Sequence, residues 1–517
     1  MKSRFIGIQI DGLSYYRLKD AVRKGHCPNL ARIMVEFPPQ RYNCGLPSLT
    51  PYAQAGIMYG HNENIAGFRW TDKKKRKEFS ISNPFHAHLV EATYLDKGRG
   101  ILQGGGKSYE NLFSGGATST HLTASMLTVK GVGGIVHQMD MLLFFLSPTV
   151  AWNIFKRSSQ MAVSLVDYAY ERLTAAFRRL AGASSFKAVV TRYFSSVVLS
   201  ELVTKGLLKD MGKKVPFLYA TYNAYDENSH HKGPSSPEAY DALKDIDAQV
   251  GRLWKGGKDD YDFYILSDHG HTESVPFAHL YGMDFQKFLR LKLSAYKHEL
   301  PRTPLQVFAH RMGSFGRAAI SPVVGLERAV HIVLSKTFRS SLKSLHWQAH
   351  PYFISASDCM INLYFNFSDE KVHLSQIDRR YPDLVRILVE HPGIGMIAGV
   401  DGEDVVVVGD SGSVRIRPDY SFTQEGKPFL KEYFSDDALL ARQIADMARM
   451  RTSGDLILFS DFSKGDVVSF TNHFGSHGGA GGEQLCPFIM GPDLGDTTKT
   501  KDVRDLHQFF WRYHAVK

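Results

Sequence analysis

The stretch FIGIQIDG, residues 5–12, decides the fold because an apolar segment runs directly into an aspartate and a glycine. Three later segments have the same form: VPFLYATY at 215–222, DFYILS at 262–267 and DLILFS at 455–460. Continuous apolar runs of this length suit parallel strands that are buried on both faces. Helical patterns such as that of residues 236–255 lie between them. This alternation predicts an α/β chain with a doubly wound, mostly parallel sheet.

Each of the four runs leads to an acidic residue. Asp11, Asp268 and Asp461 follow their runs almost directly, and Asp226 comes a few residues after the 215–222 run. In doubly wound sheets, ligands bind beyond the carboxyl ends of the strands. The sequence therefore predicts a site that gathers carboxylates at one edge of the sheet.

Two long stretches interrupt this core in a chain of 517 residues, which is long for one ordinary domain. The first is rich in Lys and Arg, and we expect a basic, largely helical cap. The second is expected to be an α+β insertion, because EDVVVV, GDSG and SVRIRP at 403–418 form a hairpin pattern. The expected division is core at 1–79, 215–275 and 455–517, the first cap at 80–214 and the second insertion at 276–454.

The composition is that of a globular protein with 43% hydrophobic residues and a net charge of +10. A positive balance favours an anionic partner, for which a phosphate ester, a membrane surface and a nucleic acid are the candidates. We expect a small phosphate ester and no specific nucleic-acid binding. The four cysteines form no CxxC pair and the N-terminus has no signal-peptide pattern, so a reducing, cytoplasmic location is expected.

The most membrane-like segment is MLLFFLSPTVAWNIF at 141–155, which is shorter than the roughly 20 apolar residues that a spanning helix needs. It lies within residues 120–214, where twelve Lys and Arg stand against five Asp and Glu. One interpretation is a cap that packs on the core, and the other is a cap whose basic face makes a peripheral contact with an anionic membrane. The run KKKRK at 73–77 is interpreted as a solvated loop.

Imidazoles accompany the carboxylates at the predicted sheet edge. YDENSHHKGP, residues 225–234, reads as a polar loop that holds Asp226 and His230 together. Carboxylate and imidazole ligands without thiolates suit Zn²⁺ or Mn²⁺. The neighbours His231 and His271 are interpreted as residues beside the ligands that contact neither metal nor substrate, and His473 as a loop residue or one that supports a ligand. The candidate ligands for two adjacent metal sites are six such side chains and one hydroxyl: Asp11, Thr50, Asp226, His230, Asp268, His269 and His477.

The order of these motifs resembles the alkaline phosphatase superfamily, specifically the type I phosphodiesterase/nucleotide pyrophosphatase branch. The matching motifs are IDG, SLTP with a glycine ten residues after Thr50, D-x3-H-x2-GP, SDHG and SHGG. The resemblance covers about residues 1–75, 215–275 and 455–495 and implies an alkaline phosphatase-like core. It further implies two divalent ions, with Zn²⁺ favoured over Mn²⁺. One would be held by Asp226, His230 and His477, and the other by Asp11, Thr50, Asp268 and His269.

The same resemblance implies that Thr50 is the nucleophile and carries a covalent phosphoryl group during turnover. We expect metal-dependent hydrolysis of a phosphate ester, with a diester favoured. A phosphomonoesterase and a phosphomutase or phosphoryl transferase remain as alternatives, whereas the complete ligand set disfavours a non-enzymatic binding protein.

Arg69 is a candidate contact for the substrate, and Thr50 has a structural alternative to its role as nucleophile. Relatives that act on nucleotides often carry an asparagine about twenty residues after the nucleophile, but this region reads GFRWT at 67–71. Arg69 is the candidate to meet a phosphoryl oxygen in its place. Thr50 precedes Pro51 at an expected helix start, so a helix N-cap is the structural alternative to a nucleophile.

Overall fold

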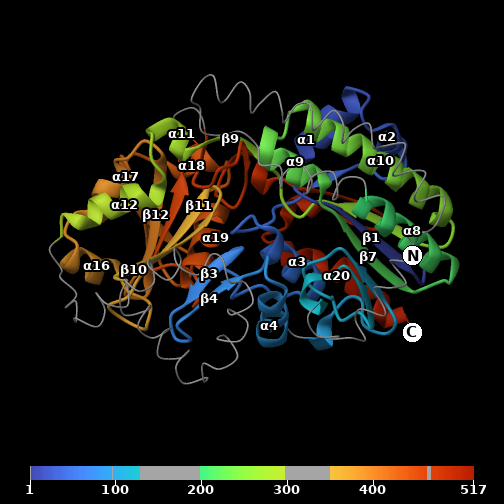
Figure 1. Ribbon diagram of the computed structural model, residues 1–517, viewed down its shortest axis with the longest axis horizontal. Coiled ribbons are helices and arrows are strands. Elements are labelled where there is room, and N and C mark those ends of the chain that lie inside the picture. Colours follow the sequence, from blue (N-terminus) through green and yellow to red (C-terminus); the bar gives the residue numbers. More distant parts are fainter. Residues whose placement is uncertain (1, 96, 128–197, 297–349, 463–466, 517) are drawn as a thin grey trace, which may run out of the picture.

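The computed structural model of the protein describes residues 2–95, 97–127, 198–296, 350–462 and 467–516. Within them, two seven-stranded sheets carry helices on their faces (Figure 1). The segment 141–155, with its expected membrane contact, lies outside the described residues. Among the helices that are described, none is long and apolar enough to cross a membrane.

The first sheet is the predicted, mostly parallel one, with strand order β2-β19-β8-β1-β7-β5-β6. Its central strand β1 (Phe5–Ile10) is parallel to β7 (Phe217–Tyr222) on one side and to β8 (Asp262–Leu266) on the other. All three strands are buried along their whole length, as their apolar sequences predict. The parallel strands β5 (Lys107–Tyr109) and β6 (Ser119–His121) and the antiparallel strands β19 (Phe488–Met490) and β2 (Gln40–Arg41) complete the sheet.

Helices cover both faces of this sheet (Figure 1). They do so because successive side chains of a strand point to opposite faces, and here both faces carry apolar side chains that must be buried. Ile6, Ile8 and Ile10 of β1 face one apolar cluster, and Phe5 faces the other. The first cluster is closed by α1 (Tyr15–Arg23), α2 (Pro28–Glu36), α8 (Ser200–Gly212), α9 (Ala224–Lys232) and α10 (Pro237–Gly257). The second is closed by α3 (Thr50–Tyr59), α4 (Pro84–Tyr94) and α20 (His507–Trp511).

The second sheet is antiparallel throughout. Its strands in spatial order are β10 (Tyr352–Ser357), β11 (Met360–Phe365), β16 (Leu456–Ser460), β12 (Ile394–Asp401), β13 (Asp404–Gly409), β14 (Gly412–Ile416) and β15 (Phe422–Gly426). One face carries α11 (Phe277–Tyr281), α12 (Phe285–Ser294), α16 (Leu374–Arg380) and α17 (Leu384–Val389), and the other carries α18 (Leu430–Tyr433) and α19 (Asp437–Arg449). The predicted hairpin is confirmed as β13–β14, with Val405 opposite Ile416.

Two expectations about the division of the chain are wrong. The run at 455–460 is not a core strand but β16, in the middle of the second sheet and antiparallel to β11 and β12. An apolar run predicts burial on both faces, but it does not say in which sheet the strand lies. Conversely, β5 and β6 belong to the central sheet although they fall inside the stretch 80–214 that was expected to be a cap. Residues 128–197 of that stretch are not described.

The two sheets are joined by a hairpin and a small third sheet. The hairpin is β3 (Arg69–Asp72) with β4 (Lys77–Ser80), and its turn holds the basic run. That run is not simply solvated, because Lys73 Nζ lies 3.0 Å from Asp455 Oδ2 and both side chains are buried. The third sheet consists of β9 (Thr272–Pro276), β17 (Val467–Ser469) and β18 (Gly475–Ser476). All four cysteines are free and buried, in agreement with their spacing.

Candidate metal centre

The carboxyl ends of β1, β7 and β8 bring the predicted ligands to one edge of the central sheet, as expected from the parallel runs. Asp11 directly follows β1, and Asp268 and His269 follow β8. Asp226 lies in α9 after β7. Asp461 follows β16 of the second sheet, and it belongs to none of the ligand groups found among the described residues.

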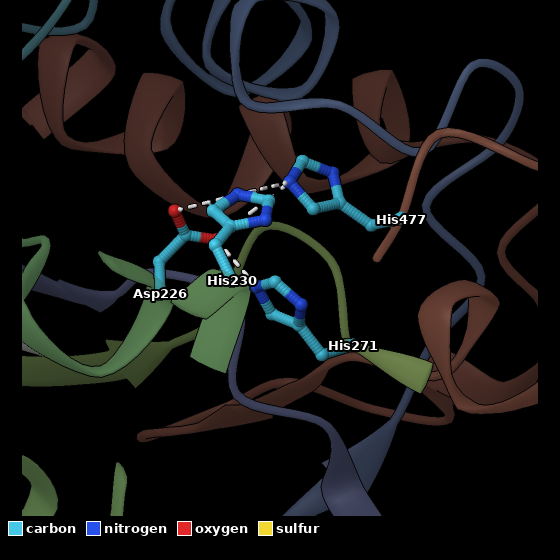
Figure 2. A group of neighbouring side chains, drawn as sticks. All are labelled: Asp226, His230, His271 and His477. Carbon is cyan, nitrogen blue, oxygen red and sulfur yellow. Dashed lines mark hydrogen bonds and ion pairs between the residues drawn. The ribbon is translucent and has the colours of Figure 1, made fainter. Parts of the chain in front are cut away.

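One group consists of Asp226, His230, His271 and His477, whose ligand atoms all lie within 4.8 Å of one another. Figure 2 shows the four side chains directed toward a common space. His230 Nε2 lies 3.3 Å from Asp226 Oδ2, and His477 Nε2 lies 3.7 Å from Asp226 Oδ1. The three residues predicted for one metal are thus together.

The segment 225–234 is a helix and not the loop that its polar composition indicated. Residues 224–232 form α9, which ends at Gly233 with a φ of 92°. Asp226 and His230 are four residues apart and therefore share one face of this helix. The short length of α9 and its Asp, Asn, Ser and His content concealed it, because these residues are weak helix formers.

A hydrogen bond to a backbone carbonyl orients the ring of each of three histidines. The Nδ1 atoms of His230, His269 and His477 lie 2.9, 3.1 and 3.0 Å from the carbonyl oxygens of Gly475, Gly270 and Ser48. A carbonyl only accepts, so each Nδ1 carries the hydrogen of the neutral ring. The lone pair is then on Nε2, which in each ring faces the carboxylates. This is the tautomer and orientation in which an imidazole binds a metal ion.

The second group consists of Asp11, Asp268 and His269, with Thr50 beside it. Thr50 Oγ1 lies 3.1 Å from His269 Nε2 and 3.5 Å from Asp11 Oδ1. Asp268 Oδ2 is fully buried and has no hydrogen-bond partner among the described residues. The rings of His269 and His477 stack with their centroids 3.9 Å apart, so the two groups are adjacent.

Thr50 occupies the first turn of α3 but does not cap it. Leu49 is the N-cap residue, and no side chain accepts a capping hydrogen bond there. The N-cap alternative for Thr50 is therefore wrong. Its hydroxyl instead faces His269 and Asp11, at a helix end whose free N–H groups favour an anion.

The pKa shifts of the buried side chains in the two groups favour bound cations. Burial, reinforced by the charges of Asp268 and Asp226, raises the pKa of Asp11 well above its usual range. Burial opposes the ionisation of Asp226 as well, but His230 and His271 hold its pKa well below the usual range. Burial also lowers the pKa of His271 to about 4 and that of His477 well below its ordinary value. His230 differs from these two rings: burial opposes its protonation, but Asp226 and Asp358 raise its pKa to about 10. The crowded, buried carboxylates therefore favour a positive charge beside them, which a divalent ion would supply in place of the proton on His230.

Two residues near the centre were not predicted as part of it. His271 Nε2 lies 2.6 Å from Asp226 Oδ1, inside the first group. Asp358 comes from the second sheet, and its Oδ2 lies 3.2 Å from His230 Nδ1. The spacing of SDHGH could have indicated His271, because it stands two residues after His269. Asp358 stands in none of the motifs IDG, SLTP, D-x3-H-x2-GP, SDHG and SHGG.

Arg69 begins β3 and its side chain is exposed. Among the described residues we find no hydrogen bond or ion pair that joins Arg69 to either group. Its contact with a phosphoryl oxygen stays a prediction.

Comparison with known proteins gives one family match. The model of the family type I phosphodiesterase / nucleotide pyrophosphatase matches residues 5–326. No curated protein sequence matches the chain. Solved structures that are similar to this chain include two at low identity. Phosphonoacetate hydrolase from Sinorhizobium meliloti 1021, in complex with phosphonoformate, is 13% identical with a TM-score of 0.46 over 99% of this chain and 95% of that chain. Murine ectonucleotide pyrophosphatase / phosphodiesterase 5 is 11% identical with a TM-score of 0.48 over 98% and 94%.

Proposed function

The chain belongs to the type I phosphodiesterase / nucleotide pyrophosphatase family of phosphoric ester hydrolases, and we propose that it is a metal-dependent phosphodiesterase with Thr50 as its nucleophile. The proposed substrate is a small phosphate ester, with a diester favoured over a monoester. This family match supports the reaction class, and the geometry around Thr50 supports the mechanism.

The position of Thr50 is the observation that carries this proposal. Its buried hydroxyl lies 3.1 Å from His269 Nε2 at the N-terminus of a helix. The stacked rings of His269 and His477 connect it to the first group of ligands, which contains His477. A hydroxyl in this place lies among the proposed ligands of a metal ion, which would lower its pKa, and at a helix end that favours a phosphoryl group.

The ligand geometry supports two divalent ions. Asp226, His230 and His477 would hold one, and Asp11, Asp268, His269 and the Thr50 hydroxyl would hold the other. Nitrogen and oxygen ligands without sulfur favour Zn²⁺, with Mn²⁺ as the alternative. When bound, such ions supply Lewis-acid chemistry, which neutralises phosphoryl oxygens and lowers the pKa of a hydroxyl.

The chain's own residues account for the two proposed steps. In the first, Thr50 Oγ1 gives its proton to solvent and forms a bond to phosphorus, while the bond from phosphorus to the leaving oxygen breaks and that oxygen departs in the alcohol product. In the second, the oxygen of a water molecule forms a bond to phosphorus, the bond between Thr50 Oγ1 and phosphorus breaks, and a proton from that water returns to Thr50 Oγ1. The free N–H groups of the first turn of α3 orient the phosphoryl oxygens in both steps.

A substrate panel tests the proposal. Chelator-stripped protein is assayed with bis-p-nitrophenyl phosphate and p-nitrophenyl phosphate, without metal and after addition of Zn²⁺ or Mn²⁺. We expect turnover only with metal, and faster turnover of the diester. Preference for the monoester would support the phosphomonoesterase alternative, and transfer to an added alcohol would support the transferase. No turnover of either ester with either metal would contradict the proposal.

A further inference from the structure

The turn between β10 and β11 extends from the second sheet to the metal centre. Asp358 and Cys359 form this two-residue turn, since Ser357 is paired with Met360. Asp358 has a φ of 49°, a left-handed conformation that Asp tolerates and that tight hairpins require. Phe470 N donates to Asp358 O at 2.7 Å, and Cys359 N donates to His477 O at 3.1 Å. The turn is therefore fixed by backbone bonds to the segment that carries His477.

The Asp358 carboxylate is buried and lies near three imidazoles. Its Oδ2 is 3.9 Å from His477 Nε2, and the carboxylate makes closer contacts with two other rings. Its Oδ2 lies 3.2 Å from His230 Nδ1, and its Oδ1 lies 2.8 Å from His473 Nδ1. The hydroxyl of Thr471 also donates to Oδ1. The rings of His230 and His473 lie 4.3 Å apart, so the carboxylate bridges two packed rings.

We propose that Asp358 is a positioning residue, which holds the imidazole of His230 in the orientation and tautomer that bind a metal ion through Nε2. This inference rests on the proposed function, because it takes His230 as a metal ligand. The Nδ1 hydrogen of His230 has two acceptors, Gly475 O at 2.9 Å and Asp358 Oδ2. A carboxylate on the far nitrogen of an imidazole fixes the ring and makes the near nitrogen a stronger donor to a metal.

A third ion held by His230, Asp358 and His473 is the competing interpretation of the same cluster. It would need a lone pair on His230 Nδ1. The carbonyl of Gly475 already requires a hydrogen on that atom, so the geometry favours positioning. The consequence is that the second sheet, which carries none of the motif residues at the central sheet edge, takes part in forming the metal centre.

Zinc titration of the full chain tests this inference. Chelator-stripped wild-type protein and the Asp358→Asn variant are titrated with Zn²⁺ against a chromophoric chelator. We expect two ions in both proteins, with the affinity of one site about 10–100-fold weaker in the variant and the other unchanged. Turnover of the variant should recover toward the wild-type level as free Zn²⁺ is raised. Asp369→Asn is the matched control, because Asp369 is an exposed carboxylate that pairs with Arg76.

Each outcome has a distinct meaning. Equal affinities at both sites would overturn the inference and leave the proposed function standing. Three ions in the wild-type protein and two in the variant would also overturn it, because Asp358 would then be a ligand. Wild-type protein that binds no zinc would remove the proposed function and the inference with it. If near-ultraviolet circular dichroism shows that Asp358→Asn is unfolded, Thr471→Val replaces it and should weaken the same site roughly two- to fivefold, the effect of one lost hydrogen bond. No change in that variant would overturn the inference.

Discussion

The Nε2 atoms of His230 and His477 lie 3.2 Å apart, although the two residues are separated by 247 positions in the chain. Because the Nδ1 atom of each ring faces a backbone carbonyl, the Nε2 lone pairs of the neutral rings are directed at the same space. Two lone pairs so close repel each other unless a proton or a cation lies between them. Asp226, within 3.7 Å of both, adds a negative charge that a divalent ion would balance.

Replacement of His477 tests whether this arrangement holds an ion. We expect His477→Ala to bind about one divalent ion per chain where the wild-type protein binds two. Turnover should fall more than about a hundredfold, beyond the usual cost of losing a residue that only supports a ligand. Elemental analysis after dialysis and a steady-state assay measure the two effects. His61→Ala, which removes a half-exposed histidine paired with Glu63, is the control. Two ions in His477→Ala would remove that residue from the metal site.

Alanine variants of Gly12 and Gly25 distinguish the loss of stability that backbone strain causes from the loss of metal binding that a disturbed site causes. The φ of Gly12 is 72°, and an added Cβ would lie 2.6 Å from the ring of His271 and 2.8 Å from Asp226 Oδ1. Gly25 has a similar φ of 77°, but a Cβ there would meet nothing within 4 Å. We expect both alanine variants to lose about 1–2 kcal/mol of unfolding free energy, and only Gly12→Ala to lose metal binding and turnover. Normal metal binding by Gly12→Ala would argue against the close packing of Gly12 on these ligands.

Lys73 should contribute much more to stability than its neighbour Lys74. Lys73 and Asp455 form a buried pair, whereas Lys74 and Glu370 form an exposed one. Removal of one partner leaves a buried charge unpaired, so Lys73→Met is expected to cost about 3 kcal/mol of unfolding free energy. Lys74→Met should change it by no more than about 0.5 kcal/mol. Urea unfolding measures both, and equal effects would disprove the role of Lys73 in joining the two sheets.

Glu110 should make the stability of the protein fall as the pH rises. Burial raises the pKa of Glu110 to about 8, and a hydrogen bond from Asn223 only partly offsets this. In the unfolded chain the group ionises near its ordinary pKa of about 4.5. Between these values the unfolded chain binds fewer protons, so the free energy of unfolding decreases with pH by up to about 1.4 kcal/mol per unit.

Glu110→Gln tests this pH dependence because the amide resembles the protonated acid. The part of the decline between pH 5 and 8 that Glu110 causes should be absent in this variant. Unfolding free energies of the wild-type protein and the variant are compared at several pH values. Glu403→Gln, which changes an exposed residue in the turn between β12 and β13, serves as control. Parallel pH profiles for Glu110→Gln and the wild-type protein would show that Glu110 is not buried in its neutral form.

The sequence predicts the centre of the molecule well for a physical reason. The strands β1, β7 and β8 are apolar along their length, and parallel strands present their carboxyl ends at one edge. Residues that follow them directly, such as Asp11 and Asp268, therefore have their place determined by the strand pattern alone. Family motifs add His230 and His477, whose places no strand pattern predicts.

The remaining parts depend on contacts between distant segments. The run at 455–460 has the same apolar pattern as the core strands, and only its neighbours β11 and β12 place it in the second sheet. Asp358 reaches His230 because a hairpin turn packs on the loop of His477, and no local pattern encodes that contact. The helix of Asp226 and His230 was missed because its residues favour turns when taken singly.

The proposed mechanism depends on a covalent bond between Thr50 and phosphorus. Thr50→Ser should keep part of the turnover, because a hydroxyl remains, while Thr50→Ala should lose about three orders of magnitude or more. Both variants should still bind two ions, since the six carboxylate and imidazole ligands are unchanged. These effects would be consistent with other roles for the hydroxyl, so the adduct itself is the stronger test.

The direct measurement is rapid quenching of the zinc-loaded enzyme with bis-p-nitrophenyl phosphate, followed by digestion and mass spectrometry. We expect a p-nitrophenyl phosphoryl adduct on the peptide that contains Thr50, formed within the first turnover and absent from Thr50→Ala. Its amount should decline as the substrate is consumed. Rapid turnover without any adduct on that peptide, or near-normal turnover by Thr50→Ala, would contradict the covalent mechanism and the assignment of Thr50 as nucleophile.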